Sequence, residues 1–155
     1  MKVKMKHQLG KVVCGFPGVG KSFMSAERGW ADSDSSEFSW VGEGKDKKRN
    51  PEFPQNYMFH VIDLILDNPS AVVMCSTHKD VRDALVANKI PFTLVYPSWD
   101  CKEEYIERYR TRGSSPTFIA LLDKMWTAWI AEMETEDRAV KKVVLRAGEY
   151  LKDRV

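Results

Sequence analysis

Residues 15–22 read Gly-Phe-Pro-Gly-Val-Gly-Lys-Ser and match the pattern G-x-x-x-x-G-K-[ST]. The apolar residues 11–14 before them are expected to form a buried strand, and residues 22–28 after them a helix. In this order the glycines let backbone N–H groups approach an anion, and the helix N-terminus adds a favourable dipole. The segment therefore predicts a nucleoside triphosphate site formed by Gly15, Gly18, Val19, Gly20, Lys21 and Ser22.

Within this site two side chains have predicted roles. We expect Lys21 to contact the β- and γ-phosphates and Ser22 to be a ligand of Mg²⁺. ATP and Mg²⁺ are thus the cofactors that the motif favours.

Strand and helix signals alternate along the rest of the chain, which is typical of an α/β fold with a mostly parallel sheet. Apolar runs predict strands over residues 11–14, 71–75, 92–96 and 142–145, and residues 30–36 are expected to form a second short strand. Helical spacing of apolar residues, or caps, predicts helices over residues 22–28, 55–67, 78–88, 102–112 and 116–134. We interpret the polar segment 37–54 as a long loop or lid, and the 155 residues as one domain.

Composition excludes some functions and leaves others open. The net charge of +2 is too close to neutral to predict nucleic-acid binding by itself, although basic residues cluster at 45–49 and 108–112. No apolar run approaches 18 residues, so we expect no membrane span, and no signal peptide is expected either. The three cysteines lack metal-ligand spacing, which favours reduced, mostly buried thiols in a cytoplasmic protein without a structural zinc site.

Three further segments carry a family resemblance. They are Asp32-x-Asp34, residues 94–97 (Leu-Val-Tyr-Pro), and the run Glu104-x-x-x-Arg108-x-x-x-Arg112-Gly113. With the glycine motif, they make the chain resemble P-loop small-molecule kinases, namely nucleoside monophosphate kinases and their shikimate- and gluconate-kinase relatives. Residues 32–36 and 50–57 also look like small phage-encoded proteins labelled nucleotide kinases. The resemblance implies a three-layer α/β/α fold with a mostly parallel five-stranded sheet, and Mg²⁺-dependent phosphoryl transfer from ATP.

The chain departs from adenylate kinases at the expected strand 71–75. That strand ends in Ser76-Thr77-His78 and has neither the Asp-Gly-Phe-Pro-Arg signature nor a Walker B aspartate. We therefore expect the metal site to use Ser22 and Asp32. Ser76 or Thr77 could bind a phosphate or a metal-bound water, but Thr77 is at least as suitable as a helix N-cap, and a role of His78 as a base is weaker.

Carboxylates and arginines are the other catalytic candidates, because phosphoryl transfer needs alignment and charge neutralisation. Asp32 and Asp34 follow the second expected strand, at the sheet edge where α/β proteins bind ligands. We assign Asp32 to the metal and Asp34 to the substrate; the alternative is a solvated turn or an N-cap.

Arg108 and Arg112 lie four residues apart and so share one helical face, whereas Arg110 points elsewhere. We expect the pair to clamp the transferring phosphoryl group, within a short arginine-bearing lid over residues 108–116. The alternative is a set of ion pairs with Glu103, Glu104 and Glu107.

Two binding regions remain. Residues 37–57 are the expected acceptor side, where a base could lie on the aromatic side chains of the 37–60 segment; a small satellite core is the alternative. The loop at 146–148 borders adenine in the family, so the resemblance places the base of ATP near Gly148.

The function that follows is phosphoryl transfer from ATP to a nucleoside or deoxynucleoside monophosphate. One alternative acceptor is a hydroxyl group of a small metabolite, a modified base or a nucleic-acid 5′ end. Another alternative is a nucleotide-binding regulatory module without turnover. A nucleic-acid partner is possible but not favoured.

Overall fold

The fold is built around one five-stranded sheet. The computed structural model describes residues 12–33, 40–42, 47–67, 70 and 72–154. The strands lie in the order β2-β5-β1-β6-β7 and every pairing is parallel. Their bounds are Val12–Gly15 for β1, Ala31–Asp32 for β2, Val73–Cys75 for β5, Phe92–Pro97 for β6 and Lys141–Leu145 for β7. The prediction of an α/β fold with a five-stranded parallel sheet is confirmed.

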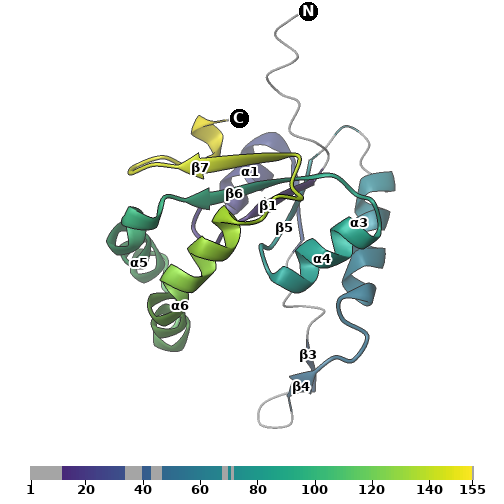
Figure 1. The fold of residues 1–155 in the computed structure, drawn as a ribbon, viewed down its shortest axis with the longest axis horizontal. Coiled ribbons are helices and arrows are strands. Elements are labelled where there is room, and N and C mark those ends of the chain that lie inside the picture. Colours follow the sequence, from purple (N-terminus) through teal and green to yellow (C-terminus); the bar gives the residue numbers. More distant parts are fainter. Residues whose placement is uncertain (1–11, 34–39, 43–46, 68–69, 71, 155) are drawn as a thin grey trace, which may run out of the picture.

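Helices cover both faces of this sheet. Figure 1 shows α4 and α6 in front of the sheet and α1 behind it. The helices are α1 (Lys21–Arg28), α3 (Gln55–Asp67), α4 (Lys79–Ala87), α5 (Lys102–Thr111) and α6 (Pro116–Glu134), and short 3-10 turns span Trp99–Cys101 and Leu151–Asp153. Parallel strands require such crossovers, which place all strand carboxyl ends at one edge. None of the described helices is long and apolar enough to span a bilayer.

Local sequence explains the end of α1 and the start of α6. Gly29 ends α1 in the left-handed conformation, at a φ of 67°, as glycine does most readily. Ser115 caps α6 by accepting a hydrogen bond from the backbone N–H of Phe118 at 3.1 Å, and Pro116 follows at the first helical position. The expectation that Thr77 caps α4 is wrong. His78 takes the cap position without a side-chain hydrogen bond, and Thr77 is buried.

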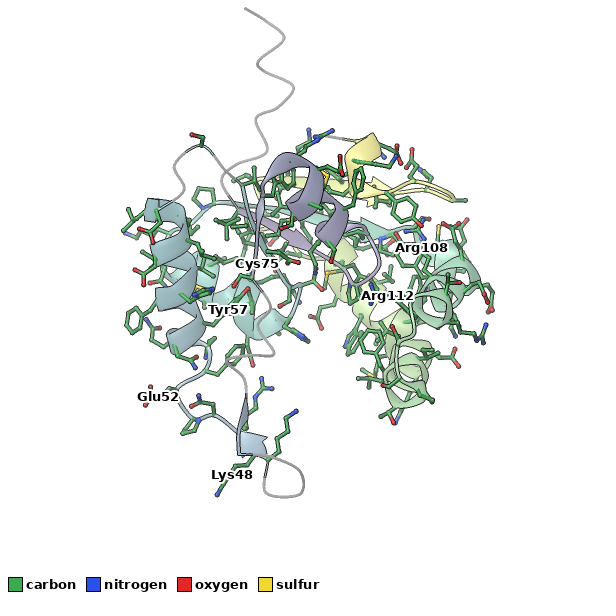
Figure 2. All side chains as sticks on the ribbon, turned by 180° about the vertical axis from the view of Figure 1, so that it is seen from behind. Lys48, Glu52, Tyr57, Cys75, Arg108 and Arg112 are labelled. Atoms are coloured by element: carbon green, nitrogen blue, oxygen red, sulfur yellow. The ribbon has the colours of Figure 1, made fainter. Side chains whose placement is uncertain are left out.

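The segment expected to be a long loop contains a small hairpin. Strands β3 (Trp40–Val41) and β4 (Lys48–Arg49) pair antiparallel, with Trp40 opposite Arg49. Figure 2 shows Lys48 on this hairpin, well away from Arg108 and Arg112. An ion pair of 3.1 Å between Arg49 and Asp80 connects the hairpin to α4.

The core is continuous from β1 to α6. The helix α6 buries Leu122, Trp126, Ile130 and Met133, whereas Leu121 is 47% exposed. The Trp126 indole packs edge-on against Phe16 with ring centroids 5.6 Å apart and donates a hydrogen bond to the carbonyl of Trp99 at 2.8 Å. This contact fixes α6 against the segment that follows β1.

A buried ionic network joins α4 to the end of α6. The Arg82 side chain is 2% exposed; it donates to the Thr77 carbonyl at 2.9 Å and to the Glu136 carboxylate at 2.7 Å. Glu132 accepts a further hydrogen bond from Arg82, and Arg138 donates to Glu136 at 2.8 Å. The network holds the turn after β5, which lies at the ligand-binding edge of the sheet.

The pKa of Glu136 makes this network sensitive to acid. Hydrogen bonds from Arg138, with a further one from Arg82, lower the pKa of Glu136 from 4.5 to about 2. A carboxyl whose pKa is lower in the folded state stabilises the fold above its unfolded pKa. We therefore expect the free energy of unfolding to fall as the pH drops from 4.5 towards 2.

Urea denaturation at a series of pH values measures this effect. In Glu136→Gln, stability at pH 7 should be lower and the loss below pH 4.5 should be smaller than in the wild type. Glu107→Gln is the control, because that carboxylate is exposed. If the free energy of unfolding of Glu136→Gln fell below pH 4.5 as much as that of the wild type, Glu136 would not be the group responsible for the acid sensitivity.

Candidate functional site

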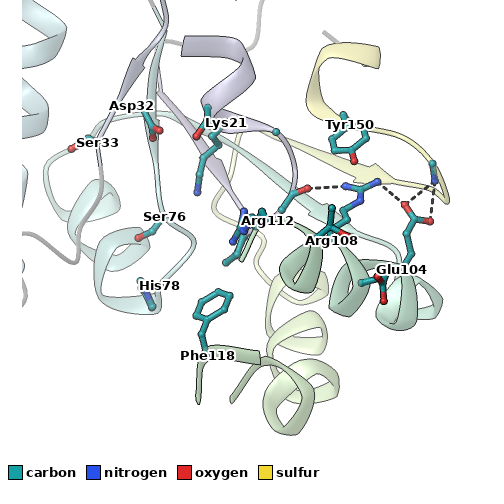
Figure 3. A pocket seen from close by; sticks show the side chains of 17 residues that line it. Lys21, Asp32, Ser33, Ser76, His78, Glu104, Arg108, Arg112, Phe118 and Tyr150 are labelled. Atoms are coloured by element: carbon teal, nitrogen blue, oxygen red, sulfur yellow. Dashed lines mark hydrogen bonds and ion pairs between the residues drawn. The ribbon is translucent and has the colours of Figure 1, made fainter. Parts of the chain in front are cut away.

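A cleft of about 1150 Å³ opens at the carboxyl ends of the strands. Residues from the loop after β1, the start of α1, the end of β2 and the turn after β5 form one side. Residues of α5, the start of α6 and the segment after β7 form the other. Figure 3 shows Lys21, Asp32, Ser76 and His78 facing the part of the cleft that Arg112 and Phe118 border. The cleft thus lies where open parallel sheets bind ligands.

The glycine-rich loop, residues 15–20, has a conformation that its glycines permit. Gly18 and Gly20 have φ values of 93° and 101°, in the region that other residues rarely adopt. A Cβ at Gly18 would lie 3.1 Å from ring atoms of both Tyr105 and Tyr109, and a Cβ at Gly20 would lie 3.3 Å from the Tyr150 ring. Glycine is therefore required at both positions for backbone shape, and at Gly18 also for packing.

Three consecutive carbonyls of this loop are bound from outside it. The Tyr109 hydroxyl donates to Pro17 O at 2.8 Å, the Arg108 guanidinium to Gly18 O at 2.7 Å, and the Leu151 N–H to Val19 O at 2.8 Å. Across a trans peptide the next N–H points the opposite way, so these bonds also fix the N–H directions of the three following residues. A loop ordered in this way suits an anion, because less ordering is needed on binding.

Lys21 and Ser22 lie in the first turn of α1. The Lys21 ammonium donates to Gly15 O at 2.7 Å, so its side chain lies across the loop that it follows. Both residues line the cleft, together with Gly18 and Gly20. Four of the six predicted phosphate-binding residues therefore lie together at the cleft, with the N-terminal dipole of α1 beside them, whereas Gly15 and Val19 do not line it.

Asp32, at the end of β2, is a second oxygen donor that lines the cleft together with Ser22. Mg²⁺ commonly takes one or two protein oxygens and completes its shell with water and substrate phosphates, so this pair fits the ion. Across the described residues no group of three or more His, Cys, Asp or Glu side chains could hold a metal alone. The other predicted carboxylate, Asp34, lies outside the described residues.

The turn after β5 contributes Ser76 and His78 to the cleft. Thr77 is 8% exposed, and its carbonyl accepts the hydrogen bond from Arg82. Thr77 lines a second, smaller hollow of about 180 Å³ instead, beside Trp129 and Met133. Of the three residues that end this strand, Ser76 and His78 are thus the ones placed to meet a ligand in the main cleft.

Arg108 and Arg112, the two arginines predicted to clamp a phosphoryl group, both line the cleft but differ in exposure and in their partners. Arg108 is 11% exposed; it binds Gly18 O, the Glu104 carboxylate at 2.5 Å and the carbonyl of Glu149 at 3.0 Å. Its guanidinium also lies 4.3 Å and 3.8 Å from the ring centroids of Tyr105 and Tyr150. Arg108 therefore fastens the glycine-rich loop to α5. It also forms the ion pair with Glu104 that was the alternative to a phosphoryl clamp.

Arg112 is exposed and lines the same cleft. Its guanidinium donates to the Ser114 hydroxyl at 3.2 Å and lies 5.1 Å from the Tyr109 ring centroid. Arg110 points away and pairs with Glu107 at 3.0 Å, as the helical spacing predicts. Among the arginines of α5 and its C-cap, Arg112 is thus the one available to a ligand's negative charge.

In the segment expected to bind the acceptor, the aromatic side chains that the structure describes do not form a platform in the cleft. They favour the alternative, a small satellite core. Tyr57 is fully buried and donates to Ser33 O at 2.8 Å, and Phe53 packs against it with ring centroids 6.1 Å apart. Phe59 is 61% exposed but does not line the cleft. Phe38 lies outside the described residues.

Gly148 lines the cleft beside the start of α5, in the loop that the resemblance places near adenine. Its N–H donates to the Glu104 carboxylate at 3.0 Å. Sequence reasoning missed the neighbouring Tyr150, which is 38% exposed and lies beside Gly20. It also missed Phe118, which lines the cleft from the first turn of α6.

The three cysteines are free and buried, as expected. Cys14 and Cys75 are register partners on β1 and β5, just before the glycine-rich loop and Ser76. The hydrogen bond between the two thiols and burial raise the pKa of Cys14 well above its usual value. Burial likewise raises the pKa of Cys101. Cys14 and Cys101 therefore remain protonated and poorly nucleophilic near neutral pH.

Comparison with protein-family models and with curated proteins finds no match.

Proposed function

We propose that the protein transfers a phosphoryl group from ATP, with Mg²⁺, to a nucleoside or deoxynucleoside monophosphate, on a P-loop kinase fold. The observation that carries the proposal is the full G-x-x-x-x-G-K-[ST] motif, whose loop lies in one cleft with Asp32 and Arg112. Phosphoryl transfer requires positioned cations and a metal more than covalent help, and this cleft offers cationic side chains together with oxygen groups that can be metal ligands.

The donor half of the reaction follows from the loop. Backbone N–H groups and the α1 dipole would hold the phosphates of ATP, with Lys21 neutralising charge as it develops. Mg²⁺ would be held by Ser22 and Asp32, and when bound it would polarise the phosphate oxygens. The base of ATP would lie towards Gly148 and Tyr150, which line the same cleft.

The acceptor half follows from the size of the cleft and from Arg112. A volume of about 1150 Å³ exceeds the roughly 300–1,000 Å³ typical of a site for one small ligand, which supports two substrates in one cleft. Arg112 would bind the transferring phosphoryl group, for which a guanidinium can form two parallel hydrogen bonds. Asp34 keeps its proposed role towards the substrate.

A hydroxyl acceptor is the second candidate, because one cleft wall favours it. Asp32, Ser76 and His78 are carboxylate, hydroxyl and imidazole groups, which can orient or deprotonate an alcohol. In the described lining of this wall, Lys21 is the one cation. A monophosphate would instead rely on Arg112 from the opposite wall.

The Arg112→Ala and Arg110→Ala variants test the proposed cleft. Labelled ATP is incubated with monophosphates and with hydroxyl acceptors, and transfer is measured for each protein. We expect Arg112→Ala to reduce kcat by about 100-fold or more, because a charge-stabilising donor is lost. Arg110→Ala, on the same helix but in a surface ion pair, should stay within about twofold. Equal effects of the two variants would contradict the role of Arg112, and transfer to hydroxyl acceptors alone would favour the second candidate.

A further inference from the structure

We propose that Phe118 is the platform on which a heterocyclic ring of the acceptor stacks. The acceptor would then be a base-bearing nucleoside or nucleotide, and not a ring-free alcohol or sugar phosphate. This inference rests on the proposed function, because it concerns the second substrate of the same cleft.

Phe118 departs from the burial pattern of its helix. Leu122, Trp126, Ile130 and Met133 continue the stripe of α6 and are each at most 2% exposed, whereas Phe118 is only partly buried. Its ring lines the cleft wall opposite the glycine-rich loop. A phenyl ring that faces a ligand cleft offers an apolar surface without a hydrogen-bonding group of its own.

The position of this ring is well fixed. The N–H of Phe118 donates to the capping Ser115 hydroxyl at 3.1 Å, so the residue lies in the ordered first turn of α6. Its ring packs against Tyr109 at a centroid distance of 5.3 Å and an angle of 80°. The Arg112 guanidinium lies 6.0 Å from the ring centroid. The platform is therefore held beside the cation proposed to bind the transferring phosphoryl group.

Aromatic side chains lie on two sides of the phosphate-binding centre. In the described lining, Tyr150 lies beside Gly20 and Gly148, and Phe118 lies beside Arg112. Figure 3 shows these two rings well separated, with Arg112 between them and Lys21 alongside. Two apolar platforms about one cationic centre match two ring-bearing substrates that meet at their phosphates.

No other described aromatic side chain supplies the acceptor's platform. Tyr57 is buried with its hydroxyl bonded to Ser33, and Phe53 packs on it. Stacking on an aromatic side chain tolerates every base, because each base has a π-face. The acceptor site should therefore require a ring but discriminate weakly between bases at this contact.

Kinetics of three variants test the proposal. Phe118→Ala should raise KM for thymidine and deoxyadenosine 5′-monophosphates by roughly 10-fold or more, as expected for loss of one stacking contact. KM for ATP should stay within about twofold. Phe118→Tyr should retain wild-type values because it keeps the ring. Leu121→Ala is the matched control, since Leu121 is exposed on the same helix and lies outside the cleft.

A base-free acceptor completes the test. Phosphoryl transfer to deoxyribose 5-phosphate should be weak in the wild type and unchanged in Phe118→Ala. Equal use of base-free and base-bearing acceptors, or a KM for ATP that rises as much as the acceptor KM, would overturn the proposal.

Equilibrium binding separates this inference from the proposed function. If the wild type transfers phosphate to no acceptor, the proposed function fails. Calorimetric titration of the same monophosphates into wild type and Phe118→Ala then decides the platform by itself. Weaker binding to Phe118→Ala would support it, and equal or undetectable binding to both proteins would overturn it.

Discussion

Replacing Lys21 with alanine is expected to reduce phosphoryl transfer by at least about 1,000-fold while the fold stays intact. On the proposed function, the Lys21 ammonium neutralises the charge that develops between donor and acceptor. In the structure it donates to Gly15 O inside the cleft. The carbonyls of Pro17, Gly18 and Val19 are bound by Tyr109, Arg108 and Leu151, so the loop does not depend on this lysine for its shape.

Transfer from labelled ATP and thermal unfolding measure the two parts of this expectation. Lys124→Ala, which removes an exposed lysine of α6, should match the wild type in both. Wild-type activity in Lys21→Ala would refute the proposed mechanism. A large fall in melting temperature would show that the lysine is needed for the fold, which the loop contacts do not predict.

Replacing Arg82 with alanine is expected to cost about 3–5 kcal/mol of folding stability, because it leaves a buried carboxylate with fewer partners. Arg82 and Glu136 are each 2% exposed and pair at 2.7 Å. The variant also removes the donor to the Thr77 carbonyl, in the turn that presents Ser76 to the cleft. We therefore expect reduced stability together with a less ordered cleft wall.

Urea denaturation at pH 7 measures the loss of folding stability. The stability of Arg82→Lys should lie between those of Arg82→Ala and the wild type, because lysine keeps the positive charge. Lys79→Ala is the matched control on α4. It breaks an exposed 2.7 Å pair with Asp83 and should cost no more than about 0.5 kcal/mol. Similar losses in Arg82→Ala and Lys79→Ala would show that burial does not decide the strength of this network.

Local patterns explain why much of the fold could be predicted. The observed bounds of α3 and α6 coincide with the predicted ones, because apolar spacing and the Ser115-Pro116 start are encoded within the segment itself. The hairpin of β3 and β4 was missed, since two-residue strands carry no alternation and Lys48 and Arg49 are polar. The cap of α4 was misplaced by one residue: Thr77 is buried, and its carbonyl accepts a hydrogen bond from Arg82 on the helix that it was expected to cap.

The candidate site was predictable where it is contiguous in sequence. The glycine-rich loop, Lys21 and Ser22 follow from one motif, and Arg112 follows from helical spacing. The fastening of Arg108 to Gly18 and Glu149 depends on contacts between distant segments, which spacing does not reveal. Phe118 carried one usable signal, since it lies in the first turn of the helix that follows the predicted arginine-bearing segment.

The hydrogen bond from Leu151 to Val19 has a consequence for how the protein is made and engineered. The glycine-rich loop is synthesised early, yet one of its carbonyls finds its partner only after residue 151 has left the ribosome. Leu151 is fully buried, so this late turn docks tightly on the loop. A nascent chain stopped before residue 148 has the motif without this contact. A fusion that displaces residues 148–153 would likewise disturb a loop that lies near the opposite end of the sequence.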